Sequence, residues 1–125
     1  MSYDNNNIFA KILRNEIPCD KVFENEHSLA FNDISPQAKV HVLVIPKNPY
    51  VDVDDFSKNA SKDEIASLMQ AVAEVCKIKK VSIDEGGNGF RLIANTGPDG
   101  SQEVPHFHYH IMGGETLGLR GLRQS

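Results

Sequence analysis

Three histidines alternate with two aromatic residues over five positions near the C-terminal end of the chain, in the sequence HFHYH at residues 106–110. In an extended strand, successive side chains point to opposite faces. The alternation therefore predicts that three imidazoles share one face while Phe107 and Tyr109 share the other. Because large aromatic side chains favour the buried face, we expect a strand over residues 103–112 with its rings in the core and its imidazoles in a groove.

The rest of the sequence predicts further strands and one long helix. Short runs of β-branched and aromatic residues indicate strands over residues 21–24, 29–32, 40–45 and 90–95. Between the last two of these, Ser61 and Glu64 form a capping-box pattern that predicts a helix running to about Lys80. An apolar stripe at helical spacing supports this helix; it consists of Ile65, Leu68, Met69, Val72, Val75 and Cys76.

These elements define a fold class. A short N-terminal helix is expected over residues 7–17, where apolar residues recur at helical spacing before Pro18 ends the pattern. Paired strands with one long helix between them predict the α+β class, with an antiparallel sheet of about five strands. The length of 125 residues fits one domain, expected over residues 1–125.

Charge and composition restrict the possible partners and compartment. The formal net charge of −4 argues against a surface built for nucleic acid. The longest apolar stretch, residues 40–46, is too short for a membrane span, and residues 1–7 show no signal-peptide pattern. Cys19 and Cys76 stand apart, without a CxxC pair, which favours a reducing compartment. We expect a cytoplasmic protein with neither a nucleic-acid nor a membrane partner.

Adjacent imidazoles on one strand are compatible with two kinds of chemistry. Two histidines separated by one residue can both reach a zinc ion, and Asp33, Asp99 or Glu103 could complete such a site. Alternatively, a neutral imidazole nitrogen can act as a nucleophile when neighbouring groups fix its tautomer. The shortage of further ligands favours the second chemistry, although the residues alone leave both open.

The chain resembles the histidine triad (HIT) superfamily. The family signature, three alternating histidines followed by apolar residues, corresponds to HFHYHIMGG at residues 106–114. Its Gly-Gly ending is similar to the histidine triad nucleotide-binding (Hint) branch rather than to the dinucleoside polyphosphate hydrolases. Further family blocks occur in the same order at residues 8–12, 16–18, 30–36 and 41–47. The resemblance covers nearly the whole chain and implies a HIT-like fold.

The resemblance also implies an activity, namely hydrolysis or transfer at the α-phosphorus of a purine nucleotide. The bond typically cleaved is the phosphorus–nitrogen bond of a nucleoside phosphoramidate. His108 matches the family nucleophile, which forms a nucleotidyl-histidine intermediate. His106 matches the residue whose backbone carbonyl orients that nucleophile, His110 matches a phosphate contact, and His41 matches a fourth histidine of the network. The family needs no metal or other cofactor for this reaction, and it forms two-fold homodimers in which the long helix and a central strand meet their copies.

Two alternative functions remain beside the phosphoramidase. Within the superfamily, the chain could be a dinucleoside polyphosphate hydrolase or a nucleotidyl transferase. In a different class, it could be a nucleotide-binding adaptor protein with incidental catalysis. The complete row of histidines favours an enzyme, because recognition alone would not need a preserved nucleophile.

The resemblance further implies a set of nucleotide-binding residues. Asp33 matches the carboxylate that binds the ribose hydroxyls, although the pattern alone favours an Asp that caps the turn at Ser35. Asn95 matches a phosphate-side donor, and Ser101 and Glu103 complete this side, with Glu103 where many family members have Ser. Residues matching the apolar slot for the base are Ile8, Phe9, Ile12, Phe31, Ile34 and Leu43.

Overall fold

All five strands in the described part of the chain join one antiparallel sheet in the order β1-β2-β3-β5-β4. The computed structural model describes residues 2–118, and the predicted α+β class with a five-stranded antiparallel sheet is confirmed. The elements along the chain are α1 (Ile8–Leu13), β1 (Lys21–Glu24), β2 (Ser28–Asn32), β3 (Val40–Pro46), α2 (Val53–Asn59), α3 (Lys62–Ile78), the 3-10 helix η1 (Ile83–Glu85), β4 (Phe90–Ile93) and β5 (Tyr109–Gly113).

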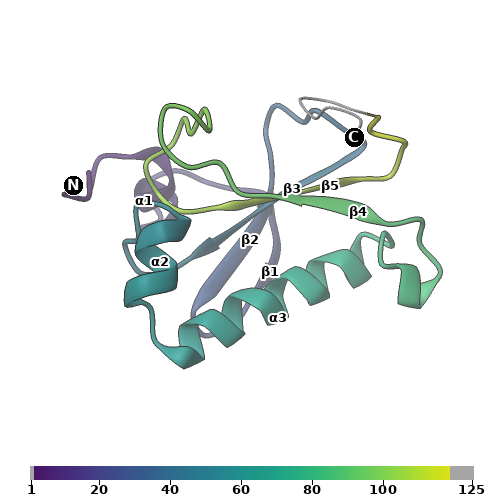
Figure 1. Ribbon diagram of the computed structural model, residues 1–125, viewed down its shortest axis with the longest axis horizontal. Helices are drawn as coiled ribbons and strands as arrows, with labels where there is room; N and C mark the ends of the chain where they lie inside the picture. The colour runs from purple at the N-terminus through teal and green to yellow at the C-terminus, as the bar shows by residue number, and fades with distance from the viewer. Residues whose placement is uncertain (1, 119–125) are drawn as a thin grey trace.

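The sheet separates two apolar cores. Helix α3 lies along one face (Figure 1), where Val42 and Val44 of β3 pack with Leu68 and Val75 of the helix. The opposite face holds the smaller core, in which α1 packs on β2 and β3 through Phe9, Ile12, Leu29, Phe31, Leu43 and Ile45. Odd-numbered residues of β3 therefore face α1, and this face also carries His41.

The predicted capping box of α3 is present. The Ser61 hydroxyl accepts a hydrogen bond from the Glu64 N–H at 3.1 Å, and the Glu64 carboxylate accepts one from the Ser61 N–H at 3.0 Å. The helix ends at Ile78, close to the predicted end, because Lys80 adopts a left-handed conformation with φ of 61°. The predicted stripe is only partly buried, since Ile65 and Met69 are 38% and 45% exposed.

Helix α1 is shorter than the sequence analysis predicts. It ends at Leu13 rather than near Ile17, because Asn15 takes a left-handed conformation with φ of 61°. The N–H of Glu16 then bonds the Lys11 carbonyl at 2.9 Å and the N–H of Asn15 bonds the Ile12 carbonyl at 3.0 Å. This is a Schellman motif, and Asn is the commonest residue after Gly at its left-handed position.

The prediction of a strand over residues 103–112 is also wrong at its N-terminal end. Strand β5 begins only at Tyr109, which pairs with Val44, so His106 and His108 precede the strand. Turns between Thr96 and Gln102 occupy the preceding chain, and the N–H of Phe107 bonds the Tyr50 carbonyl at 2.7 Å instead of a strand partner. Pro105 has no N–H to donate, which further disfavours a ladder here.

Other differences from the sequence analysis are small. Strand β4 ends at Ile93, two residues earlier than predicted, and neither α2 nor η1 is predicted by the periodicity. Helix α2 is capped by Asp52, whose side chain accepts from the Asp55 N–H at 2.8 Å. Within residues 2–118, none of the helices combines the length and apolarity that crossing a membrane requires.

Candidate active site

Strands β3 and β5, together with the end of β2, bring together residues that are far apart in the sequence. In the β3–β5 ladder, Leu43 lies opposite His110 and His41 lies opposite Met112, so the two histidines are diagonal neighbours on the α1 face. Asp33 directly follows β2, and its N–H bonds the His41 carbonyl at 3.0 Å. As a result, His41 Nε2 lies 2.9 Å from His110 Nδ1 and 3.5 Å from a carboxylate oxygen of Asp33.

The backbone fixes the tautomer of this histidine pair. His41 Nδ1 accepts a hydrogen bond from the Gln37 N–H at 3.1 Å, so the proton of the neutral ring lies on Nε2. Nε2 then donates to His110 Nδ1, which leaves the proton of a neutral His110 on its own Nε2. Burial lowers the pKa of His41, against the opposing charge of Asp33, and lowers that of His110 to about 4. His110 therefore presents an uncharged N–H donor.

His108 is held in the opposite tautomer. Its Nδ1 lies 2.7 Å from the backbone carbonyl of His106, and a carbonyl can only accept, so Nδ1 carries the proton. The lone pair is left on Nε2. The ring of Phe9 meets the His108 ring edge to face at 5.0 Å, and the His110 ring lies at the same distance on another side. Burial lowers the pKa of His108, which favours the neutral, nucleophilic form.

His106 is completely buried and bonded at both ring nitrogens. Nε2 lies 2.8 Å from the Pro46 carbonyl, and Nδ1 lies 2.5 Å from the hydroxyl of Tyr3. Since the Pro46 carbonyl must accept, Nε2 carries the proton and Nδ1 accepts from Tyr3. Burial lowers the pKa of His106 to about 4, so this ring is neutral and its backbone carbonyl is the group that acts on His108.

The cluster of Asp33, His41 and His110 also has the composition of a metal site, since its ligand atoms lie within 4.8 Å of one another. The tautomers oppose this use. A metal on His41 Nε2 would move the ring proton to Nδ1 and so break the hydrogen bond from the Gln37 N–H. The donor set therefore fits a proton-sharing pair of imidazoles better than a metal ion.

The residues predicted for the nucleoside lie around α1 and the end of β2. Phe9, Ile12, Phe31 and Leu43 are buried together in the smaller core. The two remaining apolar residues, Ile8 and Ile34, are 42% and 88% exposed. One Asp33 oxygen accepts from the Ser35 N–H at 2.8 Å, so the turn-capping role expected from the pattern is present. Each carboxylate oxygen has a second lone pair for a further donor.

The residues predicted for the phosphate side lie outside the strands, in the chain between β4 and β5. Asn95 lies two residues beyond the end of β4, and Ser101 is exposed in the following loop with a φ of 58°. Among the described residues, neither side chain hydrogen-bonds a histidine of the site. Glu103 is exposed, and its charge opposes the effect of burial by raising the pKa of His108.

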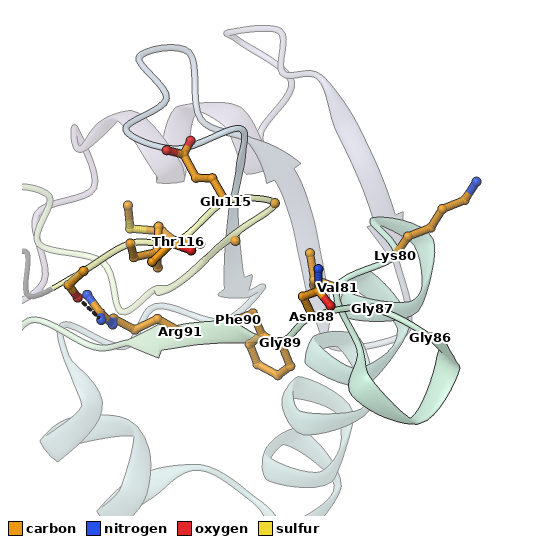
Figure 2. A pocket seen from close by; sticks show the side chains of 15 residues that line it. Lys80, Val81, Gly86, Gly87, Asn88, Gly89, Phe90, Arg91, Glu115 and Thr116 are labelled. Carbon is orange, nitrogen blue, oxygen red and sulfur yellow. Dashed lines mark hydrogen bonds between the residues drawn. The ribbon is translucent and has the colours of Figure 1, made fainter.

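A cavity of about 830 Å³ lies at the start of β4 and the end of β5, and none of these histidines lines it (Figure 2). Figure 2 shows Arg91 at this cavity, where its guanidinium donates to the Gly118 carbonyl at 2.7 Å. The cavity is lined by Lys80, Val81, residues 86–89, Phe90, Arg91 and residues 112–118. The lining combines glycines with polar and apolar side chains and includes none of the histidines described above. We therefore assign the chemistry to the histidines and not to this cavity.

Three groups that define the site are absent from the sequence analysis. These are the hydroxyl of Tyr3, the N–H of Gln37 and the carbonyl of Pro46, which set the tautomers of His106 and His41. Two of them are backbone groups, which any residue type could supply, so composition and spacing carry no signal for them. Tyr3 lies in a polar N-terminal segment with no periodicity.

Comparisons with known proteins concern the family and the fold of the chain. The sequence profile of the HIT domain matches residues 14–117. An uncharacterised HIT-like protein of Azospirillum brasilense is 54% identical over 94% of this chain and 93% of its own length. The purine nucleoside phosphoramidase of Escherichia coli K12 is 40% identical over 89% of each chain. A solved HIT family hydrolase from Clostridium thermocellum superposes with a TM-score of 0.81 at 34% identity, covering 92% of this chain and 96% of that one.

Proposed function

The chain belongs to the HIT domain family, and from this premise we propose that it hydrolyses purine nucleoside phosphoramidates at the α-phosphorus through a nucleotidyl intermediate on His108. The observation that carries the proposal is the 2.7 Å hydrogen bond from His108 Nδ1 to the His106 carbonyl. It leaves an unprotonated Nε2 on a buried ring, as a nucleophilic imidazole requires. The phosphoramidase named above supports the choice of substrate class.

The reaction divides into two displacements at phosphorus. In the first, the lone pair of His108 Nε2 forms a bond to phosphorus, the phosphorus–nitrogen bond breaks, and the departing nitrogen takes up a proton to leave as the amine. In the second, water attacks the same phosphorus, the bond to Nε2 breaks, and a proton is released with the nucleoside monophosphate. The intermediate carries a positive imidazole ring, which the His106 carbonyl and the nearby charges of Asp33 and Glu103 stabilise.

The neighbouring histidines serve the phosphate in this scheme. The Nε2–H of His110 donates to a phosphoryl oxygen, and the Gln37–His41–His110 chain of hydrogen bonds keeps that proton in place. Asp33 binds the ribose hydroxyls through the lone pairs not used by Ser35. The exposed Ile8 and Ile34 close over the base, while the buried members of the smaller core form its floor.

The substrate class is tested with a steady-state panel. We expect turnover of an adenosine phosphoramidate with kcat/KM at least about tenfold above that for diadenosine polyphosphate. The assay is repeated after exhaustive dialysis against a chelator, and activity should persist because no step uses a metal. Preference for diadenosine polyphosphate would point to the dinucleotide hydrolases, nucleotide binding without turnover would point to an adaptor, and zinc-dependent recovery would point to a metal enzyme.

The pH dependence follows from the need for a neutral His108. Burial lowers the pKa of His108 below its ordinary value of 6.5, so the nucleophile should stay active in mildly acidic solution. We expect the acid limb of kcat/KM to have its midpoint below pH 6.5. Because the charge of Asp33 raises this pKa, the Asp33→Asn variant should move the midpoint further toward acid. A midpoint above 6.5 would contradict the assignment.

We also propose a homodimer. Strand β4 lies at one edge of the sheet, and a groove of about 560 Å³ beside it is lined by Met69, Ile83 and Phe90, which are 45%, 72% and 42% exposed. An unpaired strand edge next to exposed apolar side chains is a surface that a second copy can cover. The dimer places helix α3 and strand β4 against their own copies about a two-fold axis.

Sedimentation equilibrium at micromolar concentration tests the dimer. We expect a mass twice that of the 13.9 kDa chain. Met69→Glu should shift the protein to monomer, because it introduces a charge into the groove. Ile78→Glu is the matched control, since Ile78 lies on the same helix with 46% exposure but does not line the groove. A monomeric wild-type protein, or dissociation by both variants alike, would argue against this interface.

We further propose a cytoplasmic location, which the two cysteines support. Cys19 and Cys76 both carry free thiols, and free thiols are typical of reducing compartments. Burial raises the pKa of the Cys76 thiol to about 11, so this side chain acts as an apolar core residue rather than as a reactive group.

A further inference from the structure

The segment before α1 is attached to the row of histidines through one side chain. The hydroxyl of Tyr3 lies 2.5 Å from His106 Nδ1, and the two rings meet nearly edge to face, 5.6 Å apart at 71°. Tyr3 and His106 are 103 positions apart in the sequence. This contact thus joins the N-terminal end of the described chain to the residue that orients His108.

The segment itself is fixed to α1, so the position of Tyr3 is defined. The Asn7 side chain donates to the Asp4 carbonyl at 2.7 Å and accepts from the Ala10 N–H at 2.9 Å, as the N-cap of the helix. Arg14, at the other end of α1, donates to the Asn5 carbonyl at 2.8 Å. Hydrogen bonds at both ends of the helix therefore hold residues 4–7 beside it.

The direction of the Tyr3 hydrogen bond follows from its surroundings. His106 Nε2 must donate to the Pro46 carbonyl, so the neutral ring has only Nδ1 left to accept, and the Tyr3 hydroxyl is the donor. Burial raises the pKa of Tyr3, so the hydroxyl keeps its proton. Tyr3 and Pro46 together fix the His106 ring at both nitrogens in a single tautomer.

We propose that Tyr3 is a positioning residue, which acts through His106 to hold the nucleophile His108 in its reactive tautomer. The His106 carbonyl accepts the Nδ1–H of His108 at 2.7 Å, so any rotation of residue 106 weakens the bond that keeps Nε2 unprotonated. Phe9 packs edge to face against both rings, at 6.3 and 5.0 Å, and transmits their relative position. The inference rests on the proposed function, because it concerns the same nucleophile.

The test compares Tyr3→Phe, which keeps the ring and removes the donor, with the wild-type protein. We expect kcat for an adenosine phosphoramidate to fall about fivefold to tenfold, the effect of one lost hydrogen bond, with KM within about twofold. Asn6→Ala is the matched control, because Asn6 is exposed in the same segment and this substitution keeps the Tyr3 hydroxyl. It should leave kcat unchanged. Tyr3→Phe with wild-type kcat would overturn the proposal.

A second measurement needs no turnover. Imidazole nitrogen NMR of the free protein should show one tautomer each for His106 and His108 in the wild type. In Tyr3→Phe we expect the hydrogen-bond shift of His106 Nδ1 to disappear and a second tautomer of His108 to become visible. An unchanged His108 tautomer would overturn the positioning role. If the wild-type protein shows no phosphoramidate turnover, the proposed function fails, while this measurement still decides the role of Tyr3.

Discussion

Replacing His108 with Ala is expected to lower kcat for an adenosine phosphoramidate by about 10⁴-fold or more, because the variant lacks the nitrogen that bonds to phosphorus. Binding of adenosine monophosphate should stay within about tenfold of the wild-type affinity, since the proposed ribose and base contacts are Asp33 and the smaller core, not His108. Acid quenching during turnover, followed by mass spectrometry, should detect a covalently bound nucleotide on the wild-type protein and none on the variant.

The chain provides a matched control for this experiment. His27 lies in the turn between β1 and β2, away from the site, so His27→Ala should turn over and trap the nucleotide like the wild type. Substantial activity in His108→Ala would rule out the covalent scheme. A trapped nucleotide in that variant would instead move the nucleophile to another side chain.

The second large effect is expected on stability and concerns Glu64. Its carboxylate accepts hydrogen bonds from the Ser61 N–H at 3.0 Å and from the Asn48 amide and the Tyr50 hydroxyl at 2.9 Å each. Glu64→Ala removes one half of the capping box and leaves the half-buried Tyr50 hydroxyl without its acceptor, which should lower the free energy of unfolding by about 2 kcal/mol. Urea denaturation measures the change, and the exposed neighbour Asp63→Ala should cost less than about 0.5 kcal/mol.

The same carboxylate predicts how stability depends on pH. Burial alone would raise the pKa of Glu64, but the hydrogen bonds from Ser61, Asn48 and Tyr50 outweigh it and lower the pKa from 4.5 to about 2. A group with a lowered pKa stabilises the folded state above its unfolded pKa and loses this contribution as the pH falls. The stability difference between wild type and Glu64→Gln should therefore shrink between pH 4.5 and 2. A pH-independent difference would show that the carboxylate charge contributes nothing.

The sequence predicts those features of the fold that depend on local patterns. A run of β-branched residues identifies the strand that carries His41, and alternation identifies the strand that carries His110. The Ser61–Glu64 spacing identifies the start of α3. The start of β5 could not be predicted, because residues 106–108 alternate like a strand in sequence. In the structure the Phe107 N–H bonds the Tyr50 carbonyl rather than a neighbouring strand. The tautomers of the site also depend on backbone groups brought close only by the fold.

The strand order has a consequence for how the protein is made. Strand β5 is inserted between β3 and β4, which both precede it in the sequence and are synthesised earlier. Until β5 emerges, the nascent sheet lacks the strand that lies between β3 and β4, and these two strands expose open edges to other chains. His41 meets His110 only after this insertion. The candidate site is thus completed only when β5 pairs with both neighbours, so a chain truncated before β5 lacks His110 and the strand that joins β4 to the rest of the sheet.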